Sequence, residues 1–413
     1  MNMRIVVGLL LLLAGLSARA QSYYLLVGTY TNMGSNSALP PQDSTGSKGI
    51  YVYKFDVATG RASFLSHTAG VVNPSFLAIA PDKQHVYAAT ETRTTNAGSL
   101  SAFSLDRSAG ALQFINKVPS GGDNPVYVSI HRSGRWVAIA NYTGGSLSVF
   151  PVGAGGAVLP YAQYIQHTGH SVEPTRQDRP HVHSVVFSPD SRSLYAQDLG
   201  TDSISIYSFD SALGRPLRGG RAGAGLSAQG ANRGMAGAGR PVADTLMAPV
   251  RVGTPPGSGP RHLTFHPNGR YAYLIEEMGG YVDVFQYYPG TGHLQLLQRI
   301  AAHADTAKGP FRSADIHVSP DGRYLYATNR AECTIAIFAV DAAKGTLRMV
   351  GYQPTMGREP RNFMLDPTGQ YLLVANQDTN TIVVFRVDKE TGLLRPTGER
   401  LDVPSPSCLQ MVE

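Results

Sequence analysis

The sequence predicts an all-β protein, a seven-bladed β-propeller whose ring is closed by the C-terminal strand pairing with the N-terminal blade. Three observations predict this fold. The chain has 413 residues, too many for most single hydrophobic cores. A unit of short strands and tight turns recurs along it at a spacing of roughly fifty residues. One copy of that unit is split between the two ends of the chain.

The N-terminus carries the features of a secretory signal peptide. The stretch "MNMRIVVGLLLLLAGLSARAQS" places one arginine before an apolar run and ends in the small-x-small pattern Ala18-Arg19-Ala20. We therefore expect residues 1–20 to be removed and 21–413 to form a single domain. The apolar run is too short for a comfortable membrane span. The mature protein should be exported, periplasmic or secreted, and free of the membrane.

Six copies of the repeat are complete. Each has an apolar strand, a turn at a position that is usually proline, a second strand rich in Tyr, Leu and Val, and a third strand of alternating pattern. Clear copies are "FHPNGRYAYLIEE", "VSPDGRYLYATNR" and "LDPTGQYLLVANQ". Four-stranded units at this spacing are typical of a β-propeller. A β-solenoid rung would be shorter, and stacked sandwiches would not share one unit so closely.

The seventh copy is divided between the chain ends. "YYLLVGTYT" near the N-terminus matches a second strand, and "KGIYVYKFD" matches a third strand. The missing first strand is "PSPSCLQMVE" at the C-terminus. Pairing of the two ends would close the ring and remove the free sheet edges that invite aggregation.

One region breaks the repeat. Residues 216–259 contain "RGGRAGAGLSAQGANRGMAGAGR", which is rich in Gly and Ala and has no apolar periodicity. We predict a flexible surface insertion between the fourth and fifth blades. A lid over a functional site is the alternative interpretation.

Charge and cysteine content exclude several function classes. The net charge of +6 is too weak and too scattered to indicate nucleic-acid binding. Cys333 and Cys408 are the only cysteines, so a cysteine nucleophile or a cysteine-based metal site is not expected. Export permits a disulfide between them but does not require one.

When the copies are aligned on the turn proline, positions with a structural role can be told apart from positions that could form a functional site. The position nine residues after the proline is polar in every copy, which indicates a structural hydrogen bond. The positions ten after and six before differ from copy to copy. A hairpin places these two positions opposite each other at its open end, and the innermost strands converge on the axis. The two columns therefore predict one pocket, formed by His183, Arg261, Glu277 and Arg330, with Arg361 and Glu91 as further members.

Two alternative interpretations of these residues stay open. They could have only structural roles, or some of them could bind a metal. Arg261 and Glu277 could form only a cross-strand ion pair, His183 could be a packing histidine, and Arg330 could bridge two blades. In "RPHVHSV", His181 and His183 alternate on one strand, and with Glu277 they could bind zinc. Two arginines in the same pocket disfavour a divalent cation, so we predict neither a metal nor another cofactor.

The motifs together resemble the seven-bladed propeller lactonase family. The similarity spans nearly the whole chain from Tyr23 to Glu413 apart from the insertion, and includes "LVGTYT", "VAIANYTGGSLSVFPV", "PHVHSVVFSPD" and "GPRHLTFHPNGRYAYLIEE". That family includes a class of bacterial 6-phosphogluconolactonases and the fungal carboxymuconate-lactonizing enzymes. The resemblance implies a site that needs no metal, built from one His, two Arg and one Glu. These match His183, Arg261, Arg330 and Glu277.

The expected function is that of a metal-independent hydrolase in carbohydrate metabolism, which opens a sugar lactone to the sugar acid in the manner of a 6-phosphogluconolactonase. The expected substrate is a small, anionic lactone, and the protein is expected to be a monomer. The expected roles are general base for His183, anion clamps for Arg261 and Arg330, orientation or proton transfer for Glu277, and substrate binding for Arg361, Glu91 and His181.

Two other function classes stay open. One is a lyase or cycloisomerase of the carboxymuconate-lactonizing type, with His183 protonating a carbanion. The other is a non-catalytic exported propeller that binds a polymer or a protein. An exported protein has poor access to a phosphorylated sugar lactone, so the identity of the lactone also stays open.

Overall fold

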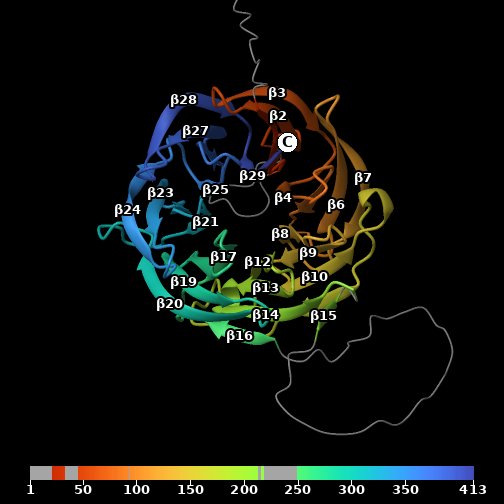
Figure 1. The fold of residues 1–413 in the computed structure, drawn as a ribbon. Coiled ribbons are helices and arrows are strands. Elements are labelled where there is room, and N and C mark those ends of the chain that lie inside the picture. The colour runs from red at the N-terminus through yellow and green to blue at the C-terminus, as the bar shows by residue number, and fades with distance from the viewer. Residues whose placement is uncertain (1–20, 33–44, 93, 213–214, 218–248) are drawn as a thin grey trace, which may run out of the picture.

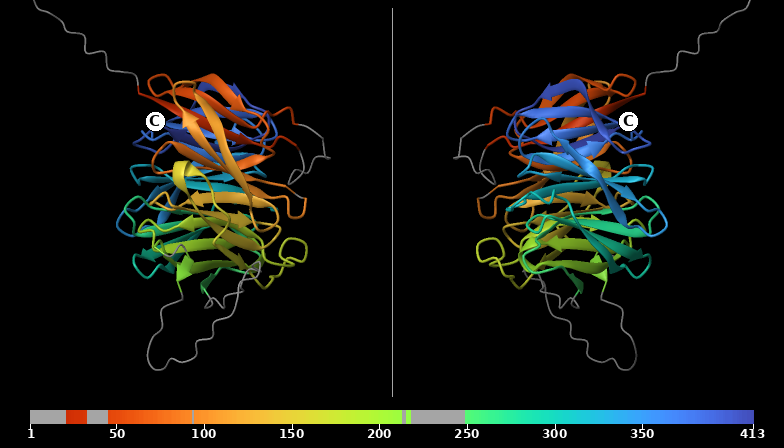
Figure 2. Two further views of the ribbon diagram at one scale, coloured as in Figure 1. Left: turned by 90° about the vertical axis from the view of Figure 1, so that its right-hand side faces the viewer. Right: turned by 90° about the vertical axis from the view of Figure 1, so that its left-hand side faces the viewer.

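The computed structural model describes residues 21–32, 45–92, 94–212, 215–217 and 249–413. The predicted signal peptide lies outside these ranges. Seven sheets stand around a central axis like the blades of a propeller, and Figures 1 and 2 show the ring along its axis and from two sides. The predicted seven-bladed β-propeller is confirmed. Within the described residues no helix is long and apolar enough to cross a membrane.

The strands of each blade follow one another from the axis outward. The first blade has β29 (Pro406–Val412), β1 (Ser22–Thr29), β2 (Ile50–Asp56) and β3 (Arg61–Thr68). The second has β4 (Pro74–Ile79), β5 (His85–Thr90), β6 (Ser99–Asp106) and β7 (Ala111–Pro119). The third has β8 (Pro125–Ile130), β9 (Trp136–Asn141), β10 (Ser146–Pro151) and β11 (Gln163–Gln166), with the short 3-10 helix η1 (Ala154–Gly156) after β10. The fourth has β12 (Val182–Phe187), β13 (Ser193–Asp198) and β14 (Ser203–Asp210), with η2 (Leu199–Thr201) between the last two, and β15 (Arg215–Leu217) and β16 (Val250–Gly253) at its outer edge.

The last three blades are regular. The fifth has β17 (Pro260–Phe265), β18 (Tyr271–Glu276), β19 (Tyr281–Tyr288) and β20 (His293–Ala301). The sixth has β21 (Ser313–Val318), β22 (Tyr324–Asn329), β23 (Thr334–Val340) and β24 (Leu347–Pro354). The seventh has β25 (Pro360–Leu365), β26 (Tyr371–Asn376), β27 (Thr381–Val387) and β28 (Leu394–Asp402).

The ring closes as the split repeat predicts. Strand β29 pairs antiparallel with β1, with Tyr24 opposite Val412 and Gly28 opposite Cys408. The C-terminal strand is thereby the innermost strand of the N-terminal blade (Figure 1). Cys408 is buried in the core and Cys333 is half-buried, and both are free thiols.

The hydrophobic core lies between neighbouring blades. Strands β13, β18, β22 and β26, each second from the axis, are buried along their whole length. Their near-continuous runs of Tyr, Leu, Ala and Val follow from this position, because each blade packs face to face against a blade on either side. The outermost strands β20 and β28 are mostly exposed or half-buried, as expected at the edge of a blade.

A β-bulge recurs on the innermost strands, six residues before the turn proline. In the fourth, fifth and seventh blades the register shifts around His183, Arg261 and Arg361, which stand unpaired in the bulge. The other innermost strands shift register near the same position. A bulge re-aims side chains and is frequent beside functional sites. Here it brings both the bulged residue and the residue after it to the axis, so that Arg261 and His262 line the same small void.

The predicted insertion is wrong in its bounds. Arg215–Leu217 and Val250–Gly253 both pair with β14, so the two segments share the outer edge of the fourth blade. The extra sequence therefore interrupts the outermost strand of that blade rather than joining the fourth and fifth blades. Alternation in "VRVG" allows this pairing. Residues 218–248, the Gly/Ala-rich stretch itself, lie outside the described part of the chain.

Removal of that stretch should change stability little. Deleting 218–240 and joining the ends with a short Gly/Ser loop leaves both edge strands on β14, and the entropy of loop closure varies slowly with length. We expect a melting temperature within about 2 °C of the intact protein, measured by circular dichroism. Retained folding with lost activity would instead support the lid interpretation.

Candidate functional site

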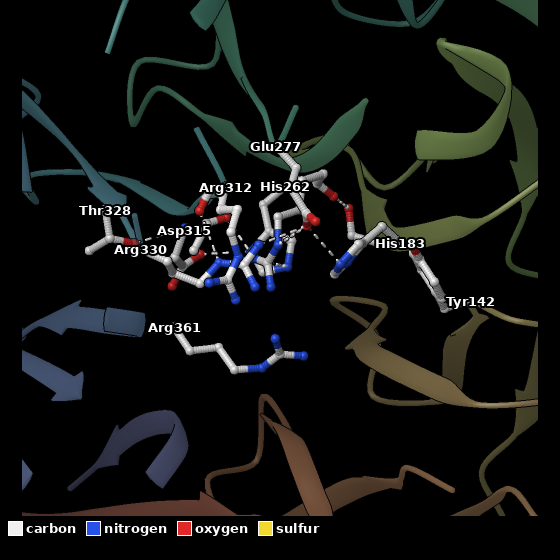
Figure 3. A network of polar contacts seen from close by, with 12 residues as sticks. Tyr142, His183, His262, Glu277, Arg312, Asp315, Thr328, Arg330 and Arg361 are labelled. Carbon is white, nitrogen blue, oxygen red and sulfur yellow. Dashed lines mark hydrogen bonds and ion pairs between the residues drawn. The ribbon is translucent and has the colours of Figure 1, made fainter. Parts of the chain in front are cut away.

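Glu277 is the centre of a buried polar cluster at one end of the axis. It follows β18, and its backbone N–H donates to the carbonyl of Gly259. Its Oε2 lies 3.1 Å from Nε of Arg261, 3.1 Å from Nη2 of Arg330 and 3.5 Å from Nε2 of His183 (Figure 3). All four residues, His183, Arg261, Glu277 and Arg330, are buried, with an exposed fraction of at most 6%. The structure thus brings together all four residues that the two columns predict.

The carboxylate of Glu277 stays ionised in spite of its burial. Burial by itself would raise the pKa of Glu277, but the charges of Arg330 and Arg176 outweigh it and hold the pKa well below 4.5. An ionised Glu277 acts as a fixed acceptor that orients the groups around it. It is unsuited to donate a proton at neutral pH.

His183 is a neutral imidazole. Burial, followed by the positive charge of Arg261, lowers the pKa of His183 well below 6.5. Its Nδ1 is buried and makes no hydrogen bond within the described residues. With the proton on Nε2, where Glu277 lies 3.5 Å away, Nδ1 keeps a free lone pair. The ring is therefore a neutral base whose Nδ1 is buried without a hydrogen-bond partner among the described residues.

Arg261 is held on three sides. Its Nε contacts Glu277, and its Nη1 donates to the carbonyl oxygen of Ala314 at 2.6 Å. The same Nη1 lies 3.3 Å and 3.1 Å from the two ring nitrogens of His262. Nearly equal distances place Nη1 over the face of the imidazole, since an approach in the ring plane would collide with Cε1. This is a cation–π contact, which fixes the guanidinium without consuming a ring nitrogen.

A second group of polar side chains lies next to Arg261 and consists of His262, Asp315 and His317. The sequence pattern did not predict this group. Asp315 accepts from Nδ1 of His262 at 2.8 Å and contacts Nε2 of His317 at 3.0 Å. Burial and Arg261 lower the pKa of His262 to about 4, so this ring is neutral. Burial would lower the pKa of His317 as well, but Asp315 outweighs it and raises that pKa. His262 and Asp315 both stand five positions before their turn prolines, and only the bulge explains why this position reaches the site.

Arg176 is a further residue that the sequence pattern did not predict. It lies on the irregular segment between β11 and β12, outside the repeat, so no column contains it. Its Nη2 is 2.7 Å from Oε1 of Glu277 and 3.0 Å from the hydroxyl of Tyr142. Its side chain is 41% exposed. Arg176 therefore covers Glu277 on the solvent side.

The remaining predicted residues lie farther from Glu277. Arg361 extends into the channel across from Glu277 (Figure 3), and its Nη2 is 3.9 Å from Oε2 of Glu91. His181 precedes β12, and its ring stacks on Tyr142 at 4.6 Å between centroids. Arg361 is thus inside the channel, while Glu91 lies beside Arg361 and His181 lies beside Tyr142.

A cleft of about 460 Å³ opens beside the cluster. Charge is supplied to its wall by Glu173, Arg176, Glu277 and Arg312, and apolar surface by Val172, Pro174, Met278, Pro310 and Phe311. Arg312 also contacts Glu359 at 2.7 Å, and Arg330 lies 3.4 Å from the same carboxylate. A cleft of this size and mixed lining suits one small ligand with a polar edge.

The site is rich in arginine. Five guanidinium groups, those of Arg176, Arg261, Arg312, Arg330 and Arg361, lie among the carboxylates of Glu91, Glu173, Glu277, Asp315 and Glu359. Among the described residues no group of three His, Cys, Asp or Glu side chains is arranged to hold a metal ion.

Comparison with known proteins identifies the family. The model of the "Lactonase, 7-bladed beta-propeller" family matches residues 24–224 and 241–411. This chain belongs to the seven-bladed β-propeller lactonase family. It is accordingly an enzyme, a lactonase.

Relatives of this lactonase carry consistent names. It is 37% identical to a 6-phosphogluconolactonase of Formosa agariphila over 78% of this chain and 84% of the relative. It is 30% identical to the 6-phosphogluconolactonase of Bacillus subtilis over 83% of this chain and 85% of the relative. The structure of a periplasmic gluconolactonase of Pseudomonas aeruginosa superposes with a TM-score of 0.79 at 35% identity, covering 95% of this chain and 99% of the other.

Proposed function

We propose that this lactonase is a metal-independent hydrolase that opens a sugar lactone to the sugar acid, with His183 as general base and Arg261 and Arg330 as clamps for the developing oxyanion. The observation that carries the proposal is the convergence of these three side chains on the ionised Glu277, which also lines the adjacent arginine-rich cleft. Five arginines around the site disfavour a divalent cation, which supports a reaction without one.

The proposed reaction begins with water. Nδ1 of His183 takes a proton from the water as its oxygen bonds to the lactone carbonyl carbon. Negative charge then develops on the carbonyl oxygen, where guanidinium donors stabilise it. Nη2 of Arg330 is within 3.1 Å of Glu277 but lacks hydrogen-bond geometry, so it has a donor to offer. Collapse of the tetrahedral intermediate breaks the ring C–O bond, and the protonated His183 returns its proton to the leaving alkoxide.

Glu277 acts on the other groups rather than on the substrate in this scheme. It holds the proton of His183 on Nε2 and fixes the guanidiniums of Arg261 and Arg330. Arg361 adds positive charge to the channel, which favours an anionic lactone. Glu91, beside Arg361, and His181, beside Tyr142, belong to the proposed binding region.

The substrate and the reaction type are tested together. Acid release would be measured on D-glucono-1,5-lactone, its 6-phosphate and unrelated lactones, with the products identified by NMR. Production of the sugar acid supports hydrolysis. Conversion to an isomer or an unsaturated acid would favour the lyase or cycloisomerase, and no turnover of any lactone would favour a binding protein.

Export is part of the proposal. It rests on the N-terminal sequence and agrees with the periplasmic origin named for the Pseudomonas aeruginosa relative. Mass spectrometry of protein from the periplasm of a Gram-negative host should find an N-terminus at Gln21. Full-length protein in the cytoplasm would contradict export and favour a phosphorylated substrate.

The pH dependence follows from the low pKa of His183. The base works unprotonated, and its pKa lies well below 6.5, so activity is present above that pKa and lost as pH falls through it. We expect kcat/KM to be constant from about pH 8 down to about pH 6 and to fall only in more acidic buffers. An acid limb centred at 6.5 or higher would show that His183 is not a desolvated base.

A further inference from the structure

A small, partly enclosed void lies between the innermost strands near the propeller axis, next to the polar cluster. It has a volume of about 10 Å³, which is room for one water-sized occupant. Its wall is formed mainly by the bulged residues and those that follow them, namely Ser75, Phe76, Val126, Arg261, His262, Arg361, Asn362 and Ser407. The cleft that opens to solvent has a different lining, so the void is a separate feature.

Two buried cations at this wall have unused donors. Arg361 is 6% exposed, and none of its guanidinium nitrogens makes a hydrogen bond within the described residues. Its contacts are an ion pair to Glu91 at 3.9 Å and the ring of Tyr30 at 5.3 Å. Nη2 of Arg261 likewise makes no hydrogen bond there, because the contacts of that guanidinium involve only Nε and Nη1.

The hydroxyl of Ser75 adds a third donor. Its Oγ is buried and has no hydrogen-bond partner within the described residues. The neighbouring Ser407 uses its proton on the carbonyl oxygens of Gly28 and Ser75. Asn362 is occupied as well, since it donates to Asp315 and accepts from the backbone of Leu409.

We propose that the axial void is a halide site, which takes one chloride ion held by Arg361, Arg261 and Ser75. A monatomic anion fits the volume, whereas a carboxylate or phosphate does not. A halide accepts several N–H and O–H donors at once and needs no acceptor in return, which is the arrangement at this wall. It also places negative charge between two guanidiniums that otherwise repel each other.

A water molecule is the competing occupant. It could donate one hydrogen to Ser407 Oγ and accept from the arginines, but it carries no charge. The charge of Arg361, after burial and Arg330, lowers the pKa of Arg261, and a neutral water would leave this repulsion in place. Each guanidinium has one carboxylate partner among the described residues, Glu91 for Arg361 and Glu277 for Arg261, and a chloride would add a second anion. The proposal concerns a bound ion and does not depend on which lactone the enzyme opens.

Bromide provides the direct test. Crystals of the wild-type protein in sodium bromide should give an anomalous difference peak in the void, next to Arg361 and the hydroxyl of Ser75. A map with bromide at surface positions but none in the void, or with only a water-like peak there, would overturn the proposal.

Solution stability supplies the second measurement. At constant ionic strength, replacing sodium methanesulfonate by sodium chloride should raise the melting temperature by about 2 °C or more, because an ion that binds only the folded state stabilises it. Arg361→Gln should abolish this increase. Arg395→Gln, which removes a 79%-exposed guanidinium, should leave it intact.

Two results would contradict the halide site in solution. One is the same melting temperature in both salts for the wild type, and the other is an undiminished chloride effect in Arg361→Gln. If Arg361→Gln fails to fold, Ser75→Ala replaces it, with a several-fold weaker chloride midpoint as the expected result, and an unchanged midpoint would count against the site.

Discussion

Replacing His183 by glutamine should lower kcat/KM for the lactone by about 10²–10⁴-fold, the usual contribution of a general base. Glutamine can keep an N–H on Glu277, where Nε2 of His183 now lies, but it offers no basic nitrogen in place of Nδ1. The orientation of the arginines should therefore survive while proton removal from water is lost. Initial rates of acid release, corrected for spontaneous hydrolysis, measure the effect.

His170→Gln is the matched control, because His170 lies on the segment that leads into β12 and is exposed. It should retain full activity, and both variants should melt close to the wild type. A loss of less than a few-fold in His183→Gln would remove the general-base role. Activation of water by Glu277, with the arginines as the only oxyanion donors, would then be the better account.

Deletion of residues 406–413 should destabilise the whole ring. The first blade would lose β29, which pairs with β1 and packs beside β4 and β25. A row of backbone groups on β1 would be left without partners, and the buried side chains of Cys408 and Leu409 would leave the core. We expect a loss of several kcal/mol, seen as a fall of the melting temperature by about 10 °C or as failure to fold.

Deletion of Glu413 alone is the control for this truncation. Glu413 is exposed and contacts Lys83 and Arg107 at the surface, so its removal should change the melting temperature little. If the longer truncation also melted like the wild type, closure through the C-terminal strand would not be what holds the ring.

The repeat made most of the fold predictable. A hydrophobic pattern of period two and a turn at a fixed position specify each blade, and the split copy specifies the closure. The same alignment found Arg261 and Glu277, because the hairpin places the two columns opposite each other. Only the outer edge of the fourth blade was wrongly bounded, since the short alternation in Val250–Gly253 is separated from its blade by the Gly/Ala-rich stretch.

The alignment of repeats could not find His262 and Asp315, or Arg176, which covers Glu277 on the solvent side. A single β-bulge changes which side chains face the axis. The alternation of residues in "GPRHLTF" therefore does not predict that both Arg261 and His262 point inward. Asp315 was missed for the same reason. Arg176 lies in irregular chain, where position is set by tertiary contacts with Tyr142 and Glu277 rather than by a local pattern.

In the proposed mechanism an ionised Glu277 organises lactone hydrolysis without a metal. The most direct measurement is the rate of acid release from the preferred lactone by EDTA-dialysed wild type and by Glu277→Gln, in the same buffers. Neutral glutamine cannot balance the charges of Arg261 and Arg330 or hold the proton of His183 in place. We expect an undiminished rate for the dialysed wild type and a loss of about 100-fold or more for Glu277→Gln. A wild type inactivated by EDTA and restored by a divalent cation, or a Glu277→Gln variant with nearly full activity, would contradict it.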